Sequence, residues 1–164
     1  MLKVILTGPE SCGKTTICKA LSDYFKTPYC KEYAREYLKK DLKYNQEDLY
    51  KIAKIQLKSE QDKRILDTDL ITIKIWSDFK FGNCENWILN QINKQRHEKR
   101  FYLLCRPDIE WEADPLRENP NNRIEIFETY KNTLEKLGHN FSIIKGTNRN
   151  YKAILKIQEI SPDF

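Results

Sequence analysis

The sequence predicts an α/β fold of three layers, with a central, mostly parallel sheet of five strands flanked by helices. Short apolar segments occur five times along the chain, and apolar residues recur between them at the three-to-four-residue spacing of helices. Strands that alternate with helices pair in parallel through right-handed crossovers. The 164 residues contain 40% hydrophobic side chains and show no internal repeat or low-complexity linker, so we expect residues 1–164 to form a single domain.

The first element is a buried strand over residues 2–6, whose residues are almost all apolar. It leads at once into residues 7–16, TGPESCGKTT, and helical spacing follows from Ile17 to Phe25. This segment fills every fixed position of the phosphate-binding P-loop pattern G-x-x-x-x-G-K-[ST]. The order of strand, loop and helix is the one in which a P-loop binds phosphate at the start of a helix.

Each fixed position of the P-loop has its own chemical task. The glycines let the backbone wrap around phosphate, Lys14 reaches the β- and γ-phosphates, and the Thr15 hydroxyl ligates Mg²⁺. We therefore expect ATP and Mg²⁺ as co-substrate and metal. The expected ATP-binding residues are Gly8, Pro9, Glu10, Ser11, Cys12, Gly13, Lys14, Thr15 and Thr16.

The remaining elements alternate along the chain. Gly82 and Gly138 are expected to stop two of the helices, and Asn45 to begin another with Asp48 three residues on. The pattern predicts strands over 29–30, 65–66, 101–105 and 141–144. It predicts helices over 45–62, 70–82, 86–95 and 126–137. Tyr151, Ile154, Leu155 and Gln158 mark a final helix.

Residues 106–123 break this alternation. They contain prolines, arginines and acidic residues with little apolar periodicity, which is typical of a long functional loop. We predict a lid in which Arg106, Arg117 and Arg123 neutralise charge on the transferred phosphoryl group, although solvated loop arginines are the alternative. Arg117 is preferred because Trp111 and Asp114 precede it in a compact, proline-rich turn.

Carboxylates at strand ends are the candidate catalytic groups. Asp67 follows an apolar strand, so it is expected to anchor Mg²⁺ opposite Thr15, and Asp69 to act beside it. The alternative is that these aspartates only cap the next helix. Glu32, after the second strand, is the candidate base for the acceptor hydroxyl, with Glu36 as the weaker alternative base. A surface ion pair between Glu32 and Arg35 is the non-catalytic alternative.

The loop after the last strand is the candidate adenine site. Ligands of open α/β sheets bind at the carboxyl ends of the strands, so we expect the base of ATP beside residues 146–149, with Thr147 and Asn148 as binding residues. An ordinary strand-to-helix turn would also favour glycine and asparagine here.

Composition limits the partners and the compartment. The net charge of +5 comes from interspersed charges, which gives no indication of nucleic-acid binding. The five cysteines have no C-x-x-C pair or zinc spacing, which suits a reducing compartment. Met1 directly precedes the first strand and no apolar run approaches membrane-spanning length, so we expect no signal peptide, no membrane association and a cytoplasmic location. No pattern indicates an oligomeric state.

Taken together, four segments resemble the ribosylnicotinamide kinase domain of the NadR type, related to nucleoside and nucleotide kinases. They are Gly8–Thr15, Glu32–Glu36 (EYARE), Asp67–Thr72 (DTDLIT) and Glu110–Arg117 (EWEADPLR). The resemblance implies that Lys14 and Thr15 hold ATP and magnesium, that Asp67 and Asp69 lie at the reaction centre, and that residues 111–117 belong to the lid. The implied reaction phosphorylates the ribose 5′-hydroxyl of nicotinamide riboside.

The resemblance also implies an aromatic residue before the Glu-Tyr pair to stack on the acceptor ring, where this chain has Lys31. Trp76, Trp111 or Tyr33 could supply that face instead. The expected acceptor-binding residues are Glu32, Tyr33, Arg35, Asp69, Trp76, Trp111 and Asp114, and the catalytic ones Lys14, Glu32, Asp67, Asp69 and Arg117. The alternative to a small-molecule kinase is an ATP-hydrolysing P-loop module or switch that acts on a protein partner.

Overall fold

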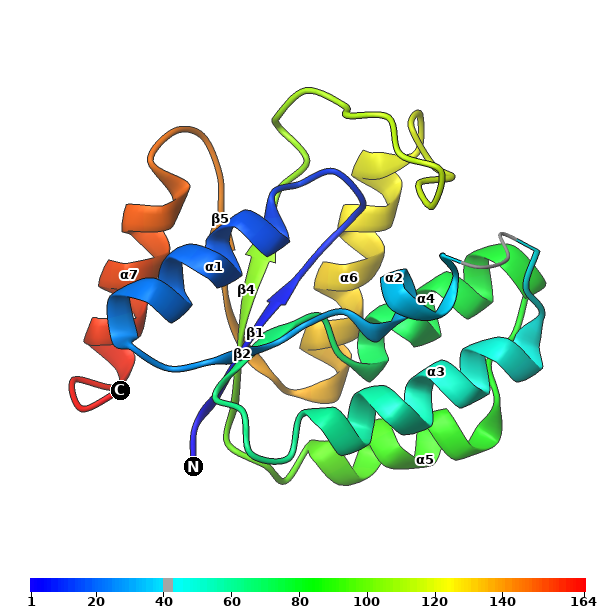
Figure 1. Ribbon diagram of the computed structural model, residues 1–164, viewed down its shortest axis with the longest axis horizontal. Helices are drawn as coiled ribbons and strands as arrows, with labels where there is room; N and C mark the ends of the chain where they lie inside the picture. Colours follow the sequence, from blue (N-terminus) through cyan, green and yellow to red (C-terminus); the bar gives the residue numbers. More distant parts are fainter. Residues whose placement is uncertain (40–42) are drawn as a thin grey trace.

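The computed structural model describes residues 1–39 and 43–164, and they form a three-layer α/β fold with an all-parallel sheet (Figure 1). The strand order is β2-β3-β1-β4-β5, and the predicted fold class is confirmed. The strands are β1 Lys3–Thr7, β2 Tyr29–Cys30, β3 Ile65–Asp67, β4 Arg100–Cys105 and β5 Asn140–Ile144. The helices are α1 Lys14–Phe25, α2 Tyr33–Tyr37, α3 Gln46–Ser59, α4 Leu70–Phe81, α5 Asn86–Gln95, α6 Arg123–Leu137 and α7 Arg149–Ile160.

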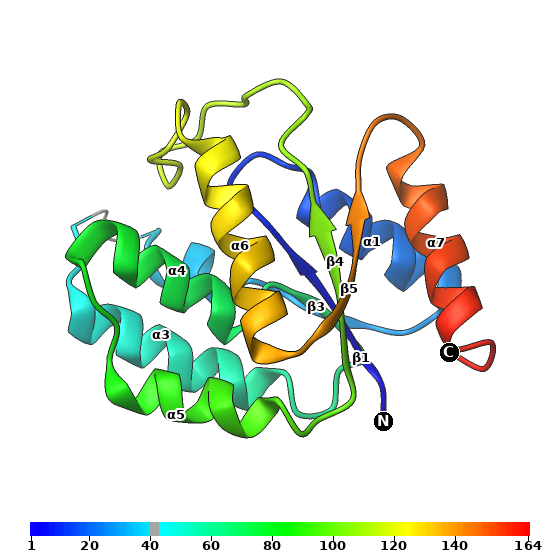
Figure 2. The ribbon, with the colours of Figure 1, turned by 180° about the vertical axis from the view of Figure 1, so that it is seen from behind.

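Helices cover both faces of the sheet, and each face has its own core. Helices α1 and α7 lie on one face and α2 to α6 on the other, as the two opposite views show (Figures 1 and 2). Strand β1 explains the division, since Val4 and Leu6 enter the α1/α7 core while Ile5 enters the other. This alternation is the period of two that a strand imposes on a sheet buried on both faces.

Local signals fix the ends of several helices. Helix α3 begins with a capping box, in which the Asn45 side chain accepts from the Asp48 N–H and the Asp48 carboxylate accepts from the Asn45 N–H. Gly82 and Gly138 end α4 and α6 with φ of 78° and 74°, the left-handed conformation that glycine adopts without strain. These boundaries confirm the sequence-based predictions.

The buried face of α7 differs from the prediction. Its buried residues are Ala153 and Ile157, whereas Tyr151 and Leu155 are 62% and 46% exposed. Apolar residues occur on both faces of this helix, so periodicity alone did not identify the face that packs against α1 and the sheet.

The parallel sheet brings the carboxyl ends of all its strands to one edge. The loop after β1, the long loop after β4 and the loop after β5 all lie at this edge, and both termini lie at the opposite end (Figure 1). Among the described residues, no helix has the length and apolar character needed to cross a membrane.

Candidate active site

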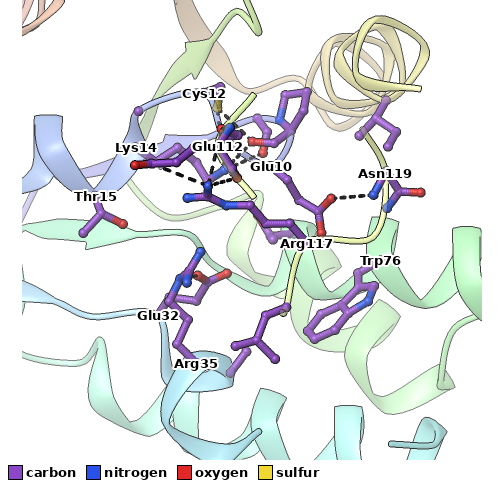
Figure 3. A pocket seen from close by; sticks show the side chains of 18 of the residues that line it. Glu10, Cys12, Lys14, Thr15, Glu32, Arg35, Trp76, Glu112, Arg117 and Asn119 are labelled. Atoms are coloured by element: carbon purple, nitrogen blue, oxygen red, sulfur yellow. Dashed lines mark hydrogen bonds and ion pairs between the residues drawn. The ribbon is translucent and has the colours of Figure 1, made fainter. Parts of the chain in front are cut away.

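A cavity of about 260 Å³ lies at the carboxyl edge of the sheet (Figure 3). Every residue of the predicted ATP-binding segment, from Gly8 to Thr16, lines it. The opposite wall comes from the start of α2 and from α4, including Glu32, Arg35 and Trp76, and the lid contributes Arg117. The P-loop and three of the predicted acceptor-binding residues therefore face one common space, whereas Tyr33, Asp69, Trp111 and Asp114 do not line it.

The P-loop has the conformation of an anion cradle. Gly8, Ser11 and Gly13 have φ of 130°, 51° and 83°, and Gly13 is the residue from which α1 begins. Positive φ at successive loop positions turns backbone N–H groups toward one concavity, where the positive end of the helix dipole adds to their effect. Ser11 is the only non-glycine among the three, and such a residue in the left-handed region is uncommon outside turns and functional sites.

The Lys14 side chain folds back onto the P-loop. Its Nζ donates to the carbonyl oxygens of Gly8 at 2.9 Å and Pro9 at 2.5 Å and lies 3.6 Å from the Cys12 sulfur (Figure 3). Burial lowers the pKa of Lys14, but the negative charges around it, those of Glu32 and Asp67 among them, raise it by more. The ammonium group is thus charged and placed at the phosphate end of the cavity.

Thr15 and Asp67 form the predicted pair at the end of β3. The Thr15 hydroxyl donates to Asp67 Oδ2 at 2.6 Å, while the buried Oδ1 has no hydrogen-bond partner. Burial raises the pKa of Asp67, and the Thr15 hydrogen bond and the Lys14 charge oppose that shift. An unpartnered buried carboxylate oxygen beside a threonine hydroxyl fits Mg²⁺, which proteins hold through one or two side chains together with substrate phosphates.

Glu32 lies across the cavity from the P-loop. It precedes α2, and its Oε2 accepts from Arg35 Nε at 3.1 Å, so the ion pair considered as the alternative does form. Glu32 nevertheless lines the cavity, which an ordinary surface pair would not do. Burial and the Asp67 carboxylate raise the pKa of Glu32, and Lys14 and Arg35 lower it by less. The result is a carboxylate with raised basicity facing Lys14 and Thr15.

Asp69 lies outside the cavity, so the structure does not bring it to the predicted reaction centre. Its Oδ1 accepts from the Ile71 N–H and caps α4, the alternative that the sequence had left open. Its Oδ2 accepts from Tyr102 at 2.7 Å and from Arg100 at 3.3 Å, and Arg100 also pairs with Glu60. Both carboxylate oxygens are engaged in a network in which all side chains are buried, and this network holds α4 to β4.

The lid is fastened to the P-loop by side chains of the loop itself. The Glu10 carboxylate accepts from the backbone N–H groups of Glu118 at 3.0 Å and Asn119 at 2.9 Å (Figure 3). The Ser11 hydroxyl accepts from the Glu112 N–H at 2.9 Å. Residues 106–122 contain no helix or strand, as predicted for a lid, and they cross directly over residues 10 and 11.

The three predicted lid arginines differ in position. Arg117 lines the cavity and its Nη1 contacts the Glu112 carbonyl and the Ser11 hydroxyl. Arg123, the first residue of α6, donates to the Ser11 carbonyl at 3.0 Å but does not line the cavity. Arg106 is exposed and lies outside the cavity, so for this residue the structure agrees with the solvated alternative.

One of the three candidate aromatic residues faces the cavity. Trp76 lines it and packs edge-on against Tyr44, to whose hydroxyl its Nε1 donates. Trp111 lies under the Arg123 guanidinium at 5.5 Å, and Tyr33 packs against Tyr37; neither lines the cavity. Figure 3 shows the Trp76 ring beside the lid, on the side away from Thr15.

The predicted adenine loop lies beside the P-loop but outside the cavity. Thr147 and Asn148 are part of the turn that leads into α7, and neither lines the cavity. Arg149, the last residue of the predicted loop 146–149, donates to the Cys12 carbonyl at 2.9 Å and pairs with Asp108. No separate role was predicted for it, although a cation in the first turn of a helix opposes the helix dipole and is an unusual placement.

Other cavity residues had no distinguishing signal in the sequence. Tyr130 lies on the apolar face of α6, where its pattern is that of a core residue, and Thr72 lies on α4. The rest of the wall on the α2 and α4 side is apolar, and it consists of Ala34, Leu38, Ile75 and Phe79. These positions follow from which helix faces turn toward the cavity, and periodicity does not distinguish a cavity wall from a core.

The fold and the loop after β1 define a P-loop nucleotide-binding domain. A family model described as an AAA domain matches residues 3–150, and the chain belongs to that family. No curated protein matches the chain.

Among solved structures, two of the NadR protein are similar to this chain. The complex with NR has a TM-score of 0.69 at 19% identity over 96% of this chain and 50% of that chain. The complex with NAD and AMP-PNP has a TM-score of 0.72 at 18% identity over 99% of this chain and 50% of that chain. The chain thus spans half the length of the NadR chains that it matches.

A third solved structure is similar over its whole length. It is the YorR protein from Bacillus subtilis in complex with phosphorylated GDP, with a TM-score of 0.57 at 20% identity over 98% of each chain. At these identities the likeness concerns the fold.

The Thr15–Asp67 pair gives the first prediction. Asp67→Asn removes the negative charge beside Thr15, so we expect it to raise the Mg²⁺ concentration needed for half-maximal ATP turnover. A magnesium titration of the purified protein measures this. Asp69→Asn is the matched control, since that carboxylate lies in the buried network, and it should lower thermal stability without moving the magnesium midpoint. A shift for Asp69→Asn alone would transfer the metal role to Asp69.

Proposed function

We propose that the protein is a small-molecule kinase that transfers the γ-phosphoryl group of ATP to the ribose 5′-hydroxyl of a nucleoside, with nicotinamide riboside as the leading acceptor. The observation that carries this proposal is the presence of Glu32 in the same cavity as Lys14 and Thr15. A phosphate-binding loop alone would serve hydrolysis or switching equally well. A carboxylate with a raised pKa across from it supplies the base that transfer to a hydroxyl requires.

Each side chain has a distinct part in the proposed transfer. Lys14 and the P-loop N–H groups bind the phosphates, and Arg117 from the lid adds positive charge on the side of the γ-phosphate. Thr15 and Asp67 would hold Mg²⁺, which supplies further charge neutralisation when it is bound. Glu32 accepts the proton of the attacking hydroxyl, and the lid covers the P-loop at residues 10 and 11.

The wall opposite the P-loop suits a planar, positively charged ring. Trp76 and Phe79 offer aromatic surface on this wall, and a pyridinium ring gains from contact with aromatic faces. Lys31, which would repel such a ring, is exposed and does not line the cavity. The NadR structure in complex with NR supports the same acceptor.

Adenine is proposed to bind near Thr147 and Asn148. The loop before α7 is tied to the P-loop by Arg149, which donates to the Cys12 and Arg106 carbonyls. Backbone groups of this loop are therefore held at a fixed position next to the phosphate site, at the carboxyl edge of the sheet.

A panel of nucleosides that includes nicotinamide riboside tests the proposal. We expect ADP to form only when an acceptor is present, with the nucleoside monophosphate as the second product detected by mass spectrometry. Nicotinamide riboside should give the highest kcat/KM in the panel. Steady ATP hydrolysis without acceptor, and no phosphorylated nucleoside, would instead support the ATP-hydrolysing module.

The raised pKa of Glu32 gives a pH prediction. The base acts in its ionised form, so activity should rise with pH as Glu32 loses its proton, and this limb should lie above the usual range for glutamate because burial raises the pKa. Glu32→Gln should remove the limb and lower kcat by roughly 10²–10⁴-fold while ATP affinity is retained. Glu36→Gln, at an exposed position of α2, tests the alternative base and should leave kcat unchanged. Loss of ATP affinity in Glu32→Gln would contradict the assignment.

A further inference from the structure

The lid residue Asp114 contacts both sides of the cavity through one carboxylate. Its Oδ1 accepts from the Leu116 N–H at 2.9 Å, and its backbone carbonyl accepts from the Arg117 N–H at 2.9 Å. These two bonds close the turn that presents Arg117 to the cavity. Its Oδ2 accepts from Arg35 Nη1 at 3.0 Å, a contact to the opposite wall.

Arg35 carries this contact on to Glu32. While Nη1 donates to Asp114, Nε of the same guanidinium donates to Glu32 Oε2 at 3.1 Å. The guanidinium is a rigid planar fork, so fixing one end by Asp114 fixes the direction in which the other end holds Glu32. Lid and base are thereby connected through two charge-assisted hydrogen bonds and one rigid group.

We propose that Asp114 is a positioning residue that aligns the lid cation Arg117 and, through Arg35, the carboxylate of Glu32 for the same transfer step. This inference rests on the proposed kinase function. In this proposal, Asp114 and Arg35 bind each other, whereas the sequence had predicted that both contact the acceptor directly. The phosphate side and the acceptor side of the cavity then become competent together, when the lid is docked.

A purely stabilising ion pair explains the geometry less well. The Arg35 and Asp114 side chains are 40% and 27% exposed, and pairs with such exposure contribute little to folding stability. The pair joins the lid to Arg35, which lies three residues beyond the candidate base Glu32. Arg35 also contacts Glu32 and Asp114 also contacts the Arg117 N–H, and both Glu32 and Arg117 line the cavity. A role in alignment accounts for these two connections.

Two substitutions at Asp114 separate its two contacts. Asp114→Asn keeps an oxygen that accepts from the Leu116 N–H, but its amide nitrogen is a donor and cannot accept from Arg35. Asp114→Ala loses both contacts. Glu159→Gln is the control, because Glu159 is a carboxylate on α7 whose ion pair, to Lys156 at 2.9 Å, lies outside the cavity.

The experiment measures kcat with ATP and nicotinamide riboside, together with the dissociation constant of a non-hydrolysable ATP analogue. Asp114→Asn should lower kcat by about 10–100-fold, the order of loss that follows a misplaced catalytic group, with analogue affinity within about twofold of wild type. Asp114→Ala should lower kcat further, and Glu159→Gln should match wild type. Melting temperatures of all variants show whether each protein is folded.

A double-mutant cycle distinguishes alignment from a local effect. If Asp114 acts through Arg35, then Arg35→Lys and the double variant Arg35→Lys/Asp114→Asn should have the same kcat, whereas Arg35→Lys and Glu159→Gln should combine additively. Additive effects of Arg35→Lys and Asp114→Asn, or wild-type kcat in Asp114→Asn, would overturn the inference while the kinase function stands. A wild-type protein that phosphorylates no nucleoside would overturn both.

Discussion

The close approach of the P-loop to the end of β4 is the constraint on which the site depends. A Cβ atom at Gly8 would lie 2.6 Å from the Cys105 carbonyl oxygen, so only glycine allows this contact. With φ of 130° at Gly8, the chain turns over β4 and then into α1. That path places Thr15 against Asp67 of the neighbouring strand β3, and it puts Glu10 and Ser11 where the lid crosses.

The two cations on the phosphate side of the cavity, Lys14 and Arg117, have partners that substrate phosphates can replace. Lys14 is held by two carbonyl oxygens of its own loop, which are weaker partners than phosphate oxygens. Arg117 contacts the Glu112 carbonyl, the Ser11 hydroxyl and, at 3.6 Å, the Glu112 carboxylate. Both cations can turn to a triphosphate without leaving a buried carboxylate unpaired, because the Glu112 side chain is 85% exposed, whereas the Glu32–Arg35–Asp114 chain remains intact on the acceptor side.

The sequence predicted the fold correctly and singled out residues 8–16, which line the cavity, because glycines, the lysine and strand-to-helix order have strict local requirements. It could not predict which way the Asp69 side chain points. A position just after a strand is the same in the sequence whether the side chain faces the cavity or, as here, the buried Arg100 network. It also left Trp76, Trp111 and Tyr33 equivalent, since only the packing of α4 turns Trp76 toward the cavity. The partnership of Arg35 with Asp114 spans 79 positions and has no local signature.

The central claim is that the P-loop and Glu32 serve one transfer reaction across a shared cavity. A crystal structure with a non-hydrolysable ATP analogue, Mg²⁺ and nicotinamide riboside tests it most directly. The account predicts Lys14 and Arg117 on the phosphates and the ribose 5′-hydroxyl within hydrogen-bond distance of Glu32, pointing at the γ-phosphate. A nucleoside bound outside this cavity, or a 5′-hydroxyl directed away from Glu32, would contradict the claim.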